Sequence, residues 1–206
     1  MGRLRIIAGS LKGRRIQVPA DLPLRPTADR VREALFSILG SEVSEAVVLD
    51  AYAGSGALGF EALSRGAARV VFLEQERRAA EALRAAAGDL GVASRCTILE
   101  GPVSRSLRGG RIGGPFDLIL ADPPYDDSEG VAMFVPRAAD LLQKHGRLVL
   151  ERPVASEIRH SQRLRLDKSS RYGRSRLDFY LLQDPGGGRA QEPGDSGISG
   201  LEGSSS

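Results

Sequence analysis

Apolar residues follow two alternating patterns along this chain: continuous short runs, and runs in which every third or fourth residue is apolar. The continuous runs predict buried strands over residues 46–50, 69–74, 96–100, 116–121 and 147–151. The periodic runs predict helices between them, one that ends near residue 64 and two that span residues 77–89 and 131–143. Strands that alternate with helices in this way form a mostly parallel sheet with helices on both faces.

The residues before the first buried run have a different pattern. Two short strand-like segments, residues 3–8 and 14–18, flank the turn-forming sequence Gly9–Gly13, which predicts a hairpin. Thr27 can cap a helix that ends near Gly40. Its buried face is indicated by apolar residues at spacings of three and four, namely Val31, Ala34, Leu35, Ile38 and Leu39.

Two more predicted strands, residues 164–166 and 176–182, bring the expected sheet to seven strands. We therefore expect an α/β, Rossmann-like fold preceded by a β-hairpin and a helix. Three parts follow from this pattern: an extension over residues 1–40, the α/β domain over residues 41–183 and a tail over residues 184–206. The tail consists largely of Gly, Ser, Pro and acidic residues, and we expect it to be disordered because it cannot bury enough apolar surface.

Composition favours a cytoplasmic protein without a bound metal. The first residues are charged and lack the long apolar stretch of a secretion signal, and no apolar run approaches the ~18 residues that span a membrane. Cys96 is the single cysteine, which excludes an internal disulfide. Together with only two histidines, His145 and His160, this argues against a structural zinc site.

Positive charge is concentrated in two segments, although the net charge is only +3. Residues 1–32 and residues 152–176 each hold eight basic side chains against two acids, whereas the tail holds four acids and one arginine. Clustered basic residues attract phosphates, so this distribution favours nucleic-acid binding over a solvated basic surface without a partner.

Gly54, Gly56 and Gly59 form the pattern G-x-G-x-x-G between a predicted strand and a predicted helix. Glycines at these positions allow a sharp turn and a close approach of the backbone to a ligand. Glu74 lies twenty residues after Gly54 at the end of the next strand, where a carboxylate can accept hydrogen bonds from ribose hydroxyls. The pattern predicts a nucleoside-bearing cofactor, either a nicotinamide or flavin dinucleotide or S-adenosylmethionine.

Asp50 favours S-adenosylmethionine between these alternatives. It directly precedes the glycine turn, where a dinucleotide would place its doubly negative pyrophosphate. A carboxylate at this place repels a pyrophosphate, but it attracts the sulfonium and ammonium groups of S-adenosylmethionine. The alternative interpretation is a structural role, in which Asp50 caps the loop backbone.

The sequence Asp122-Pro123-Pro124-Tyr125 follows the fourth predicted strand without a gap and is the expected reaction centre. Two successive prolines fix the backbone and remove two N–H donors, which leaves carbonyl acceptors beside a carboxylate. The two hydrogens of an exocyclic amino group could be accepted by Asp122 and by the Pro123 carbonyl. This grip would orient the nitrogen for in-line attack on a methyl group, while Tyr125 offers a flat face to an extruded base.

Together these features resemble class I methyltransferases that act on exocyclic nitrogens. More narrowly, residues 3–183 resemble the RsmD family of bacterial 16S rRNA guanine-N2 methyltransferases. The motifs that carry the resemblance are the N-terminal block Arg3–Gly9 with Lys12-Gly13-Arg14, the block Leu24–Phe36, the glycine loop Leu49–Gly59, the sequence Asp122–Tyr125 and the pair Tyr172-Gly173.

The resemblance implies an enzyme that methylates a guanine N2 of 16S rRNA on protein-bearing particles and not on naked RNA, namely the small ribosomal subunit or a late assembly intermediate. We expect a monomer. The cofactor residues that the resemblance implies are Asp50, Ala53, Gly54, Gly56, Glu74, Gln75, Gly101, Pro102 and Asp122. Those implied to contact RNA are Arg3, Arg5, Lys12, Arg14, Arg15, Arg25, Arg30 and Arg174. Related enzymes often offer an Asp or Asn to the adenine amino group after the third strand, whereas this chain has Pro102 there.

Other functions remain compatible with parts of the pattern. The Asp-Pro-Pro-Tyr sequence would also suit a DNA adenine or a protein glutamine, because each presents an NH2 group. A nicotinamide-dependent oxidoreductase would need a hydride-transfer site, and no catalytic Tyr-Lys pair or histidine motif is evident. A non-catalytic RNA-binding protein on the same scaffold is suggested only by Pro102.

Overall fold

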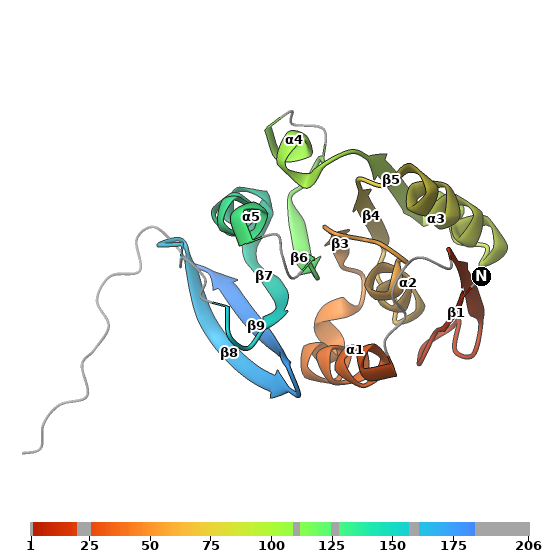
Figure 1. Ribbon diagram of the computed structural model, residues 1–206, viewed down its shortest axis with the longest axis horizontal. Helices are drawn as coiled ribbons and strands as arrows, with labels where there is room; N and C mark the ends of the chain where they lie inside the picture. The colour runs from red at the N-terminus through yellow and green to blue at the C-terminus, as the bar shows by residue number, and fades with distance from the viewer. Residues whose placement is uncertain (1, 20–25, 109–111, 125–127, 157–160, 184–206) are drawn as a thin grey trace, which may run out of the picture.

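A computed structural model describes residues 2–19, 26–108, 112–124, 128–156 and 161–183 of the chain (Figure 1). The N-terminal part contains strands β1 (Gly2–Arg5) and β2 (Arg15–Val18), helix α1 (Pro26–Leu39) and a 3-10 turn, η1 (Gly40–Val43). The rest contains β3 (Val47–Asp50), α2 (Ala57–Ser64), β4 (Arg69–Glu74), α3 (Arg77–Asp89), η2 (Ala93–Arg95), β5 (Cys96–Glu100), α4 (Val103–Arg108), β6 (Phe116–Ala121), α5 (Ser128–Leu141), β7 (Leu142–Pro153), β8 (Leu164–Tyr172) and β9 (Ser175–Leu182).

Seven strands form one sheet in the order β5-β4-β3-β6-β7-β9-β8, and β1 pairs with β2 in a separate antiparallel hairpin. Strands β3 to β7 run parallel, and β9 is antiparallel to both of its neighbours. The strand order reverses between β3 and β6, and such a reversal opens a crevice beyond the carboxyl ends of the two strands. The predicted Rossmann-like fold with an N-terminal hairpin is confirmed.

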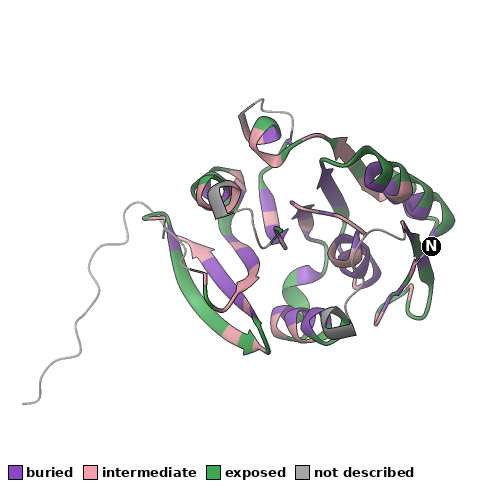
Figure 2. Cartoon of the chain, in the orientation of Figure 1, coloured by how far each residue is buried: buried purple, intermediate pink, exposed green. Residues whose placement is uncertain are grey.

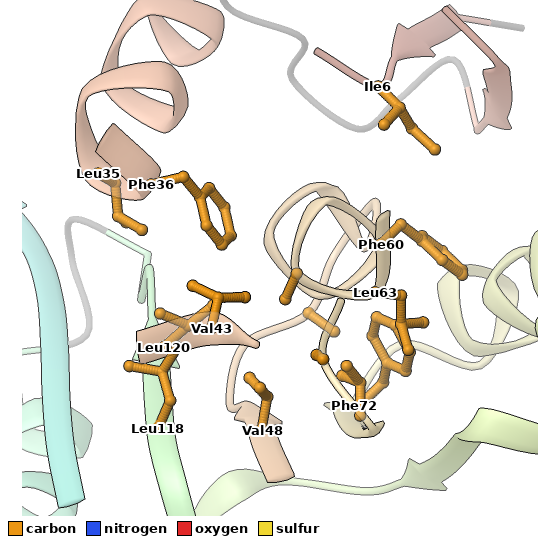
Figure 3. Close-up of a cluster of buried hydrophobic side chains, with 14 of the residues drawn as sticks. Ile6, Leu35, Phe36, Val43, Val48, Phe60, Leu63, Phe72, Leu118 and Leu120 are labelled. Atoms are coloured by element: carbon orange, nitrogen blue, oxygen red, sulfur yellow. The ribbon is translucent and has the colours of Figure 1, made fainter. Parts of the chain in front are cut away.

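Both faces of the sheet are covered, which explains why its inner strands are continuously apolar. One core cluster joins Val48 and Phe72 of the sheet to side chains of α1 and α2 (Figure 3). The same cluster includes Phe179 of β9 and side chains of α3. The second cluster, on the opposite face, joins Ile119 and Leu150 to side chains of α5. Buried residues therefore concentrate in the strands and on the inward sides of the helices (Figure 2). No helix in the described ranges is both long and apolar enough to cross a membrane.

Strand β8 is longer than the sequence predicted. Only residues 164–166 were expected to be extended, but β8 pairs with β9 from Leu164 to Tyr172. The missed part is a sheet edge in which nearly every side chain is exposed, so it lacks the apolar alternation by which a strand is recognised. Helix α4 was not predicted either, because its six residues are too few for a periodic signal.

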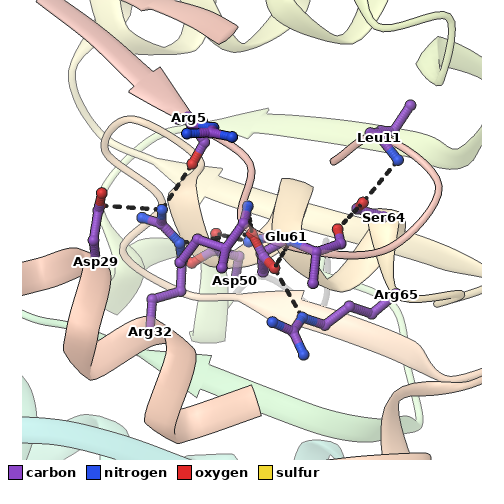
Figure 4. A network of polar contacts seen from close by, with 11 residues as sticks. Arg5, Leu11, Asp29, Arg32, Asp50, Glu61, Ser64 and Arg65 are labelled. Atoms are coloured by element: carbon purple, nitrogen blue, oxygen red, sulfur yellow. Dashed lines mark hydrogen bonds and ion pairs between the residues drawn. The ribbon is translucent and has the colours of Figure 1, made fainter. Parts of the chain in front are cut away.

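The N-terminal hairpin is hydrogen-bonded to the C-terminal half of helix α2 (Figure 4). Buried Glu61 accepts hydrogen bonds from the backbone N–H groups of Ile7 (2.8 Å) and Ala8 (3.0 Å). Ser64 lies one turn later, and its carbonyl oxygen accepts a hydrogen bond from the N–H of Ser10. Gly9 approaches this carbonyl so closely, at a φ of 81°, that a Cβ would lie 1.8 Å from the oxygen. Only glycine fits at this position.

Glu61 also compensates the positive charges of two arginines from different parts of the chain. Its Oε1 atom accepts a 2.8 Å hydrogen bond from Arg65 Nε, and its Oε2 atom lies 3.7 Å from Nε of buried Arg32. The Nη2 group of Arg32 donates in turn to the Arg5 carbonyl (2.8 Å) and to Asp29 (3.1 Å). One carboxylate thus joins α2, α1 and the hairpin.

We predict that Glu61→Gln lowers the free energy of unfolding by about 3 kcal/mol, since breaking a buried ion pair leaves its partners uncompensated. The amide also places hydrogen-bond donors against the donors of Ile7 and Ala8. Denaturant titration measures the change. Glu81→Gln is the matched control, because Glu81 forms an exposed ion pair with Arg77 and should unfold like the parent. Equal stability of the two variants would contradict the role given to Glu61.

Candidate functional site

The glycine loop connects β3 to α2 at the point where the strand order reverses. Gly56 precedes the helix with a φ of 75°, and a Cβ on it would come within 2.5 Å of Leu83. Gly59, one turn into α2, is packed so tightly that a Cβ would lie 2.2 Å from the Phe72 ring. Two of the glycines therefore serve close packing of α2 on the sheet, and this packing sets the position of the loop between them.

Glu74 ends β4 beside this loop and holds its shape. The side chain is only 8% exposed. Its Oε2 atom accepts a 2.6 Å hydrogen bond from the N–H of Gly54, and its Oε1 atom accepts a 2.7 Å bond from the N–H of Glu76. A carboxylate oxygen can accept more than one hydrogen bond, so Glu74 retains acceptor capacity toward a ligand.

Asp50 ends β3 and is buried beneath the loop, with 1% of its surface exposed. Its Oδ2 atom accepts a 2.8 Å hydrogen bond from the N–H of Gly59. The pKa of this carboxyl is raised from 3.8 to about 8, mainly by burial and to a smaller extent by the nearby charges of Asp122 and Glu74, against the opposing effect of the Gly59 hydrogen bond. The site therefore holds a carboxyl group whose ionisation is costly until a positive charge arrives.

Strand β6 delivers Asp122 to the same rim. The strand ends at Ala121, and the carbonyl of Leu120 accepts a 2.9 Å hydrogen bond from the N–H of Ala51, which fixes the end of β6 against the end of β3. Asp122 is partly buried, Pro123 is buried and Pro124 is exposed. Tyr125, the last residue of the predicted reaction centre, lies outside the described residues.

A cavity of about 660 Å³ lies at this rim. Its walls come from two parts of the chain. The loops of the sheet contribute the predicted site residues Asp50, Ala53, Gly54, Glu74, Gln75, Asp122, Pro123 and Pro124. The N-terminal extension contributes Arg3, Leu4, Arg5, Asp29, Val31 and Arg32. The structure thus brings the glycine loop, the acid of β4 and the Asp-Pro-Pro segment together.

Among the described residues that line this cavity, carboxylates outnumber guanidinium groups by six to three. The acids are Asp29, Asp50, Glu74, Glu76, Asp122 and Glu151, and the bases are Arg3, Arg5 and Arg32. A concave site with this excess of acids favours a positively charged ligand and disfavours a pyrophosphate.

Three predicted cofactor residues do not line the cavity. Gly56 is buried under the loop, and Gly101 and Pro102 lie beyond its edge. The Pro102 carbonyl accepts hydrogen bonds from the N–H groups of Arg105 and Ser106, both at 3.1 Å, and so begins α4. The next residue along the chain, Val103, lines the cavity instead.

Several lining residues were missed because no local pattern marks them. Arg32 lies in a helix whose apolar face was recognised, but nothing in the sequence indicates that its buried partner is Glu61. Tyr52, Glu151 and Ser175 line the cavity from three separate loops or strand ends. Of these three residues, only Tyr52 could have been predicted from the sequence, because it lies inside the glycine loop.

The arginines predicted to contact RNA have different environments. Arg3 and Arg5 are exposed and line the cavity mouth. Arg14 is exposed but donates a 2.6 Å hydrogen bond to the carbonyl of Asp89, which anchors the hairpin to the end of α3. The remaining described members, Lys12, Arg15, Arg30 and Arg174, are exposed, and Arg25 lies outside the described residues.

The fold and the site define the class of Rossmann-like methyltransferases, and comparison with known proteins narrows it. The chain belongs to the family described as Conserved hypothetical protein 95, whose model matches residues 4–181. This match confirms the resemblance to the RsmD family.

Three similar proteins illustrate the relationship. Ribosomal RNA small subunit methyltransferase D of Escherichia coli K12 is 39% identical over 124 residues, covering 60% of this chain and 61% of that protein. The match therefore spans about three fifths of that relative. Putative rRNA methyltransferase YlbH of Bacillus subtilis is 31% identical over 75% of this chain and 85% of its own length. The structure of the putative methyltransferase yhhF from E. coli superposes with a TM-score of 0.74 at 30% identity, covering 88% and 99% of the two chains.

We predict that Asp50→Asn stabilises the ligand-free protein, and that the gain grows with pH. The raised pKa means that the parent loses stability as pH rises from 3.8 through about 8, whereas the amide has no proton to lose. The melting temperature of the variant should exceed that of the parent by several degrees at about pH 9 and by much less at about pH 5. A difference that stays constant, or that shrinks as pH rises, would show that Asp50 does not titrate as described.

Proposed function

We propose that this chain is an S-adenosylmethionine-dependent methyltransferase that transfers a methyl group to the exocyclic N2 of a guanine in 16S rRNA. The observation that carries the proposal is that Asp50, Glu74 and the segment Asp122–Pro124 share one cavity at the switch point of the sheet. Family membership supports the reaction class, and the name of the E. coli relative supports small-subunit rRNA as the substrate.

The cavity fits the proposed cofactor in size and in charge. Its volume of about 660 Å³ lies within the usual range of small-molecule sites. Asp50 would face the ammonium and sulfonium groups, Glu74 would accept hydrogen bonds from the ribose, and Gln75 and Val103 would flank the adenine. Gly101 and Pro102, which directly follow β5, would contribute to cofactor binding through this position.

Bound S-adenosylmethionine would supply an electrophilic methyl group. Asp122 and the Pro123 carbonyl would each accept one N–H of the guanine amino group, which turns the nitrogen lone pair toward that methyl carbon. Asp122 and the Pro123 carbonyl would thereby hold the nitrogen in line for methyl transfer, with the sulfur of the cofactor as the leaving group. The nitrogen afterwards loses one proton, for which Asp122 is the nearest proposed acceptor, and Tyr125 would stack on the base.

The two parts of the chain would have different functions. Residues 1–40 would face RNA and close the cavity, with Arg3 and Arg5 at its mouth, and residues 41–183 would bind the cofactor and perform transfer. The particle recognised would be the small ribosomal subunit or a late assembly intermediate, bound by a monomeric enzyme.

The deciding experiment is transfer of label from S-adenosylmethionine to small subunits that lack the modification, followed by digestion to nucleosides. We expect label in N2-methylguanosine, whereas label in N6-methyladenosine would overturn the substrate. Asp122→Asn should lower the rate by about a hundredfold or more while the cofactor still binds. Asp140→Asn is the matched control, since Asp140 is an exposed acid on α5, and it should leave the rate unchanged.

Cofactor binding should release protons because Asp50 must ionise to face a cation. With a pKa of about 8 in the free protein, the parent at about pH 7 should release close to one proton on binding S-adenosylmethionine. Calorimetry in two buffers of different ionisation enthalpy measures this number. Asp50→Asn should remove the release and weaken binding by about tenfold or more. Equal proton release by the variant and the parent would exclude Asp50 as the partner of the cation.

A further inference from the structure

Three neighbouring strands place arginines side by side near the cavity. Arg152 on β7 is directly opposite Arg176 on β9, and Arg176 is directly opposite Arg171 on β8. Residues opposite each other in antiparallel strands project to the same face of a sheet, with their Cβ atoms only ~5 Å apart. Like charges in this arrangement repel each other. The arginine row, which consists of Arg152, Arg176 and Arg171, therefore needs negative charge to offset the repulsion.

One carboxylate on the same face of the sheet, that of Asp178, already pairs with Arg152. Asp178, which is 1% exposed, accepts a 2.6 Å hydrogen bond from Arg152 Nε and another from the Ser169 hydroxyl. A terminal nitrogen of Arg152 donates to the carbonyls of Pro153 (3.3 Å) and Ser156 (2.6 Å). Arg152 is therefore fixed and neutralised within the protein.

No such compensation of Arg171 and Arg176 is found among the residues that the structure describes. Arg171 is exposed, and its Nε donates to the Gly173 carbonyl at 3.1 Å. The Nε atom of Arg176 is buried without a hydrogen-bond partner, and no acid in the described parts of the chain pairs with its guanidinium. Two planar guanidinium groups on adjacent strands thus share one face, and none of the described residues supplies a counter-charge, an arrangement suited to a tetrahedral anion.

The row is adjacent to the cavity but separate from it. Ser175 and Glu151 line the cavity, and they directly precede Arg176 and Arg152 in the chain. Successive side chains in a strand point to opposite faces, so the arginines project away from the cofactor cavity. Figure 1 shows the β8–β9 pair and the N-terminal hairpin on opposite sides of the molecule, so positive charge flanks the cavity from two directions.

We propose that Arg171 and Arg176 bind a backbone phosphate of the substrate nucleic acid, next to the nucleotide whose base enters the cavity. The inference rests on the proposed function for the identity of the substrate. A base that leaves its stack pulls its backbone along, and a phosphate held on each side of the cavity resists that movement. S-adenosylmethionine carries no phosphate and occupies the other face, so it is not the expected ligand.

The test compares the double variant Arg171→Gln/Arg176→Gln with the control Arg165→Gln. Arg165 is an exposed arginine on β8, like Arg171, but it forms an ion pair with Asp167. The first probe is a single-stranded RNA dodecamer, titrated at several salt concentrations without cofactor. We expect its affinity to fall about tenfold in the double variant and the slope of log K against log salt to decrease by about one for each lost contact. The control should behave like the parent.

The second probe is methyl transfer to unmodified small subunits. KM for the particle should rise about tenfold in the double variant, with kcat within about twofold of the parent and cofactor affinity unchanged. Weakened cofactor binding with unchanged RNA binding would overturn the inference in favour of a cofactor role. Arg176→Lys should restore part of the affinity, because it keeps the charge and loses only the planar geometry.

The two proposals can fail separately. If the parent methylates particles but the double variant binds the dodecamer with the parent's affinity and salt slope, the phosphate site is wrong and the proposed function stands. If the parent transfers no methyl group to RNA, the proposed function is wrong, while the dodecamer titration still decides the role of the row. Removing repulsive charges should leave the melting temperature unchanged or raised, so a marked loss of stability would indicate a structural role instead. Arg171→Gln alone, at an exposed position, provides the binding test should the double variant not fold.

Discussion

The buried carboxylate of Glu61 joins the two parts of the chain on which the cavity depends. Helix α2 begins directly after Gly56, and Glu61 is the fifth of its eight residues. The same short helix therefore positions the loop at one end and the N-terminal extension at the other. Without this attachment the cavity would lose the wall formed by Arg3, Arg5 and Arg32, and the acids at the sheet rim would lie open to water.

Charge is separated by location in this molecule. Acids gather inside the cavity, where Asp50 is held at an energetic cost that the raised pKa records. Arginines lie at the cavity mouth and in the row on β8 and β9. This division suits a cationic cofactor that enters the protein and a polyanionic substrate whose phosphates stay outside it. A protein with one uniform potential would attract one of these ligands and repel the other.

The sequence predicted the inner sheet well, because strands covered on both faces must be apolar throughout. The bounds predicted for β4, β5 and β6 agree with the structure, and the glycine loop, Glu74 and Asp122 meet where the strand order implies. Edge strand β8 and short helix α4 were missed because exposure and brevity remove the periodic signal. The pairing of Arg32 with Glu61 was also out of reach, since it depends on how α1 packs against α2 and not on any local pattern.

Attachment of the hairpin to α2 also sets an order of events during synthesis. The hairpin emerges from the ribosome before its partners, because Glu61 and Ser64 follow 53 to 56 residues later, and the Asp89 carbonyl follows Arg14 by 75 residues. Until then, Ile6 and its neighbours have no surface to pack against. Contacts of such long sequence separation form late in folding, so the cavity gains its outer wall only after the inner sheet has begun to assemble.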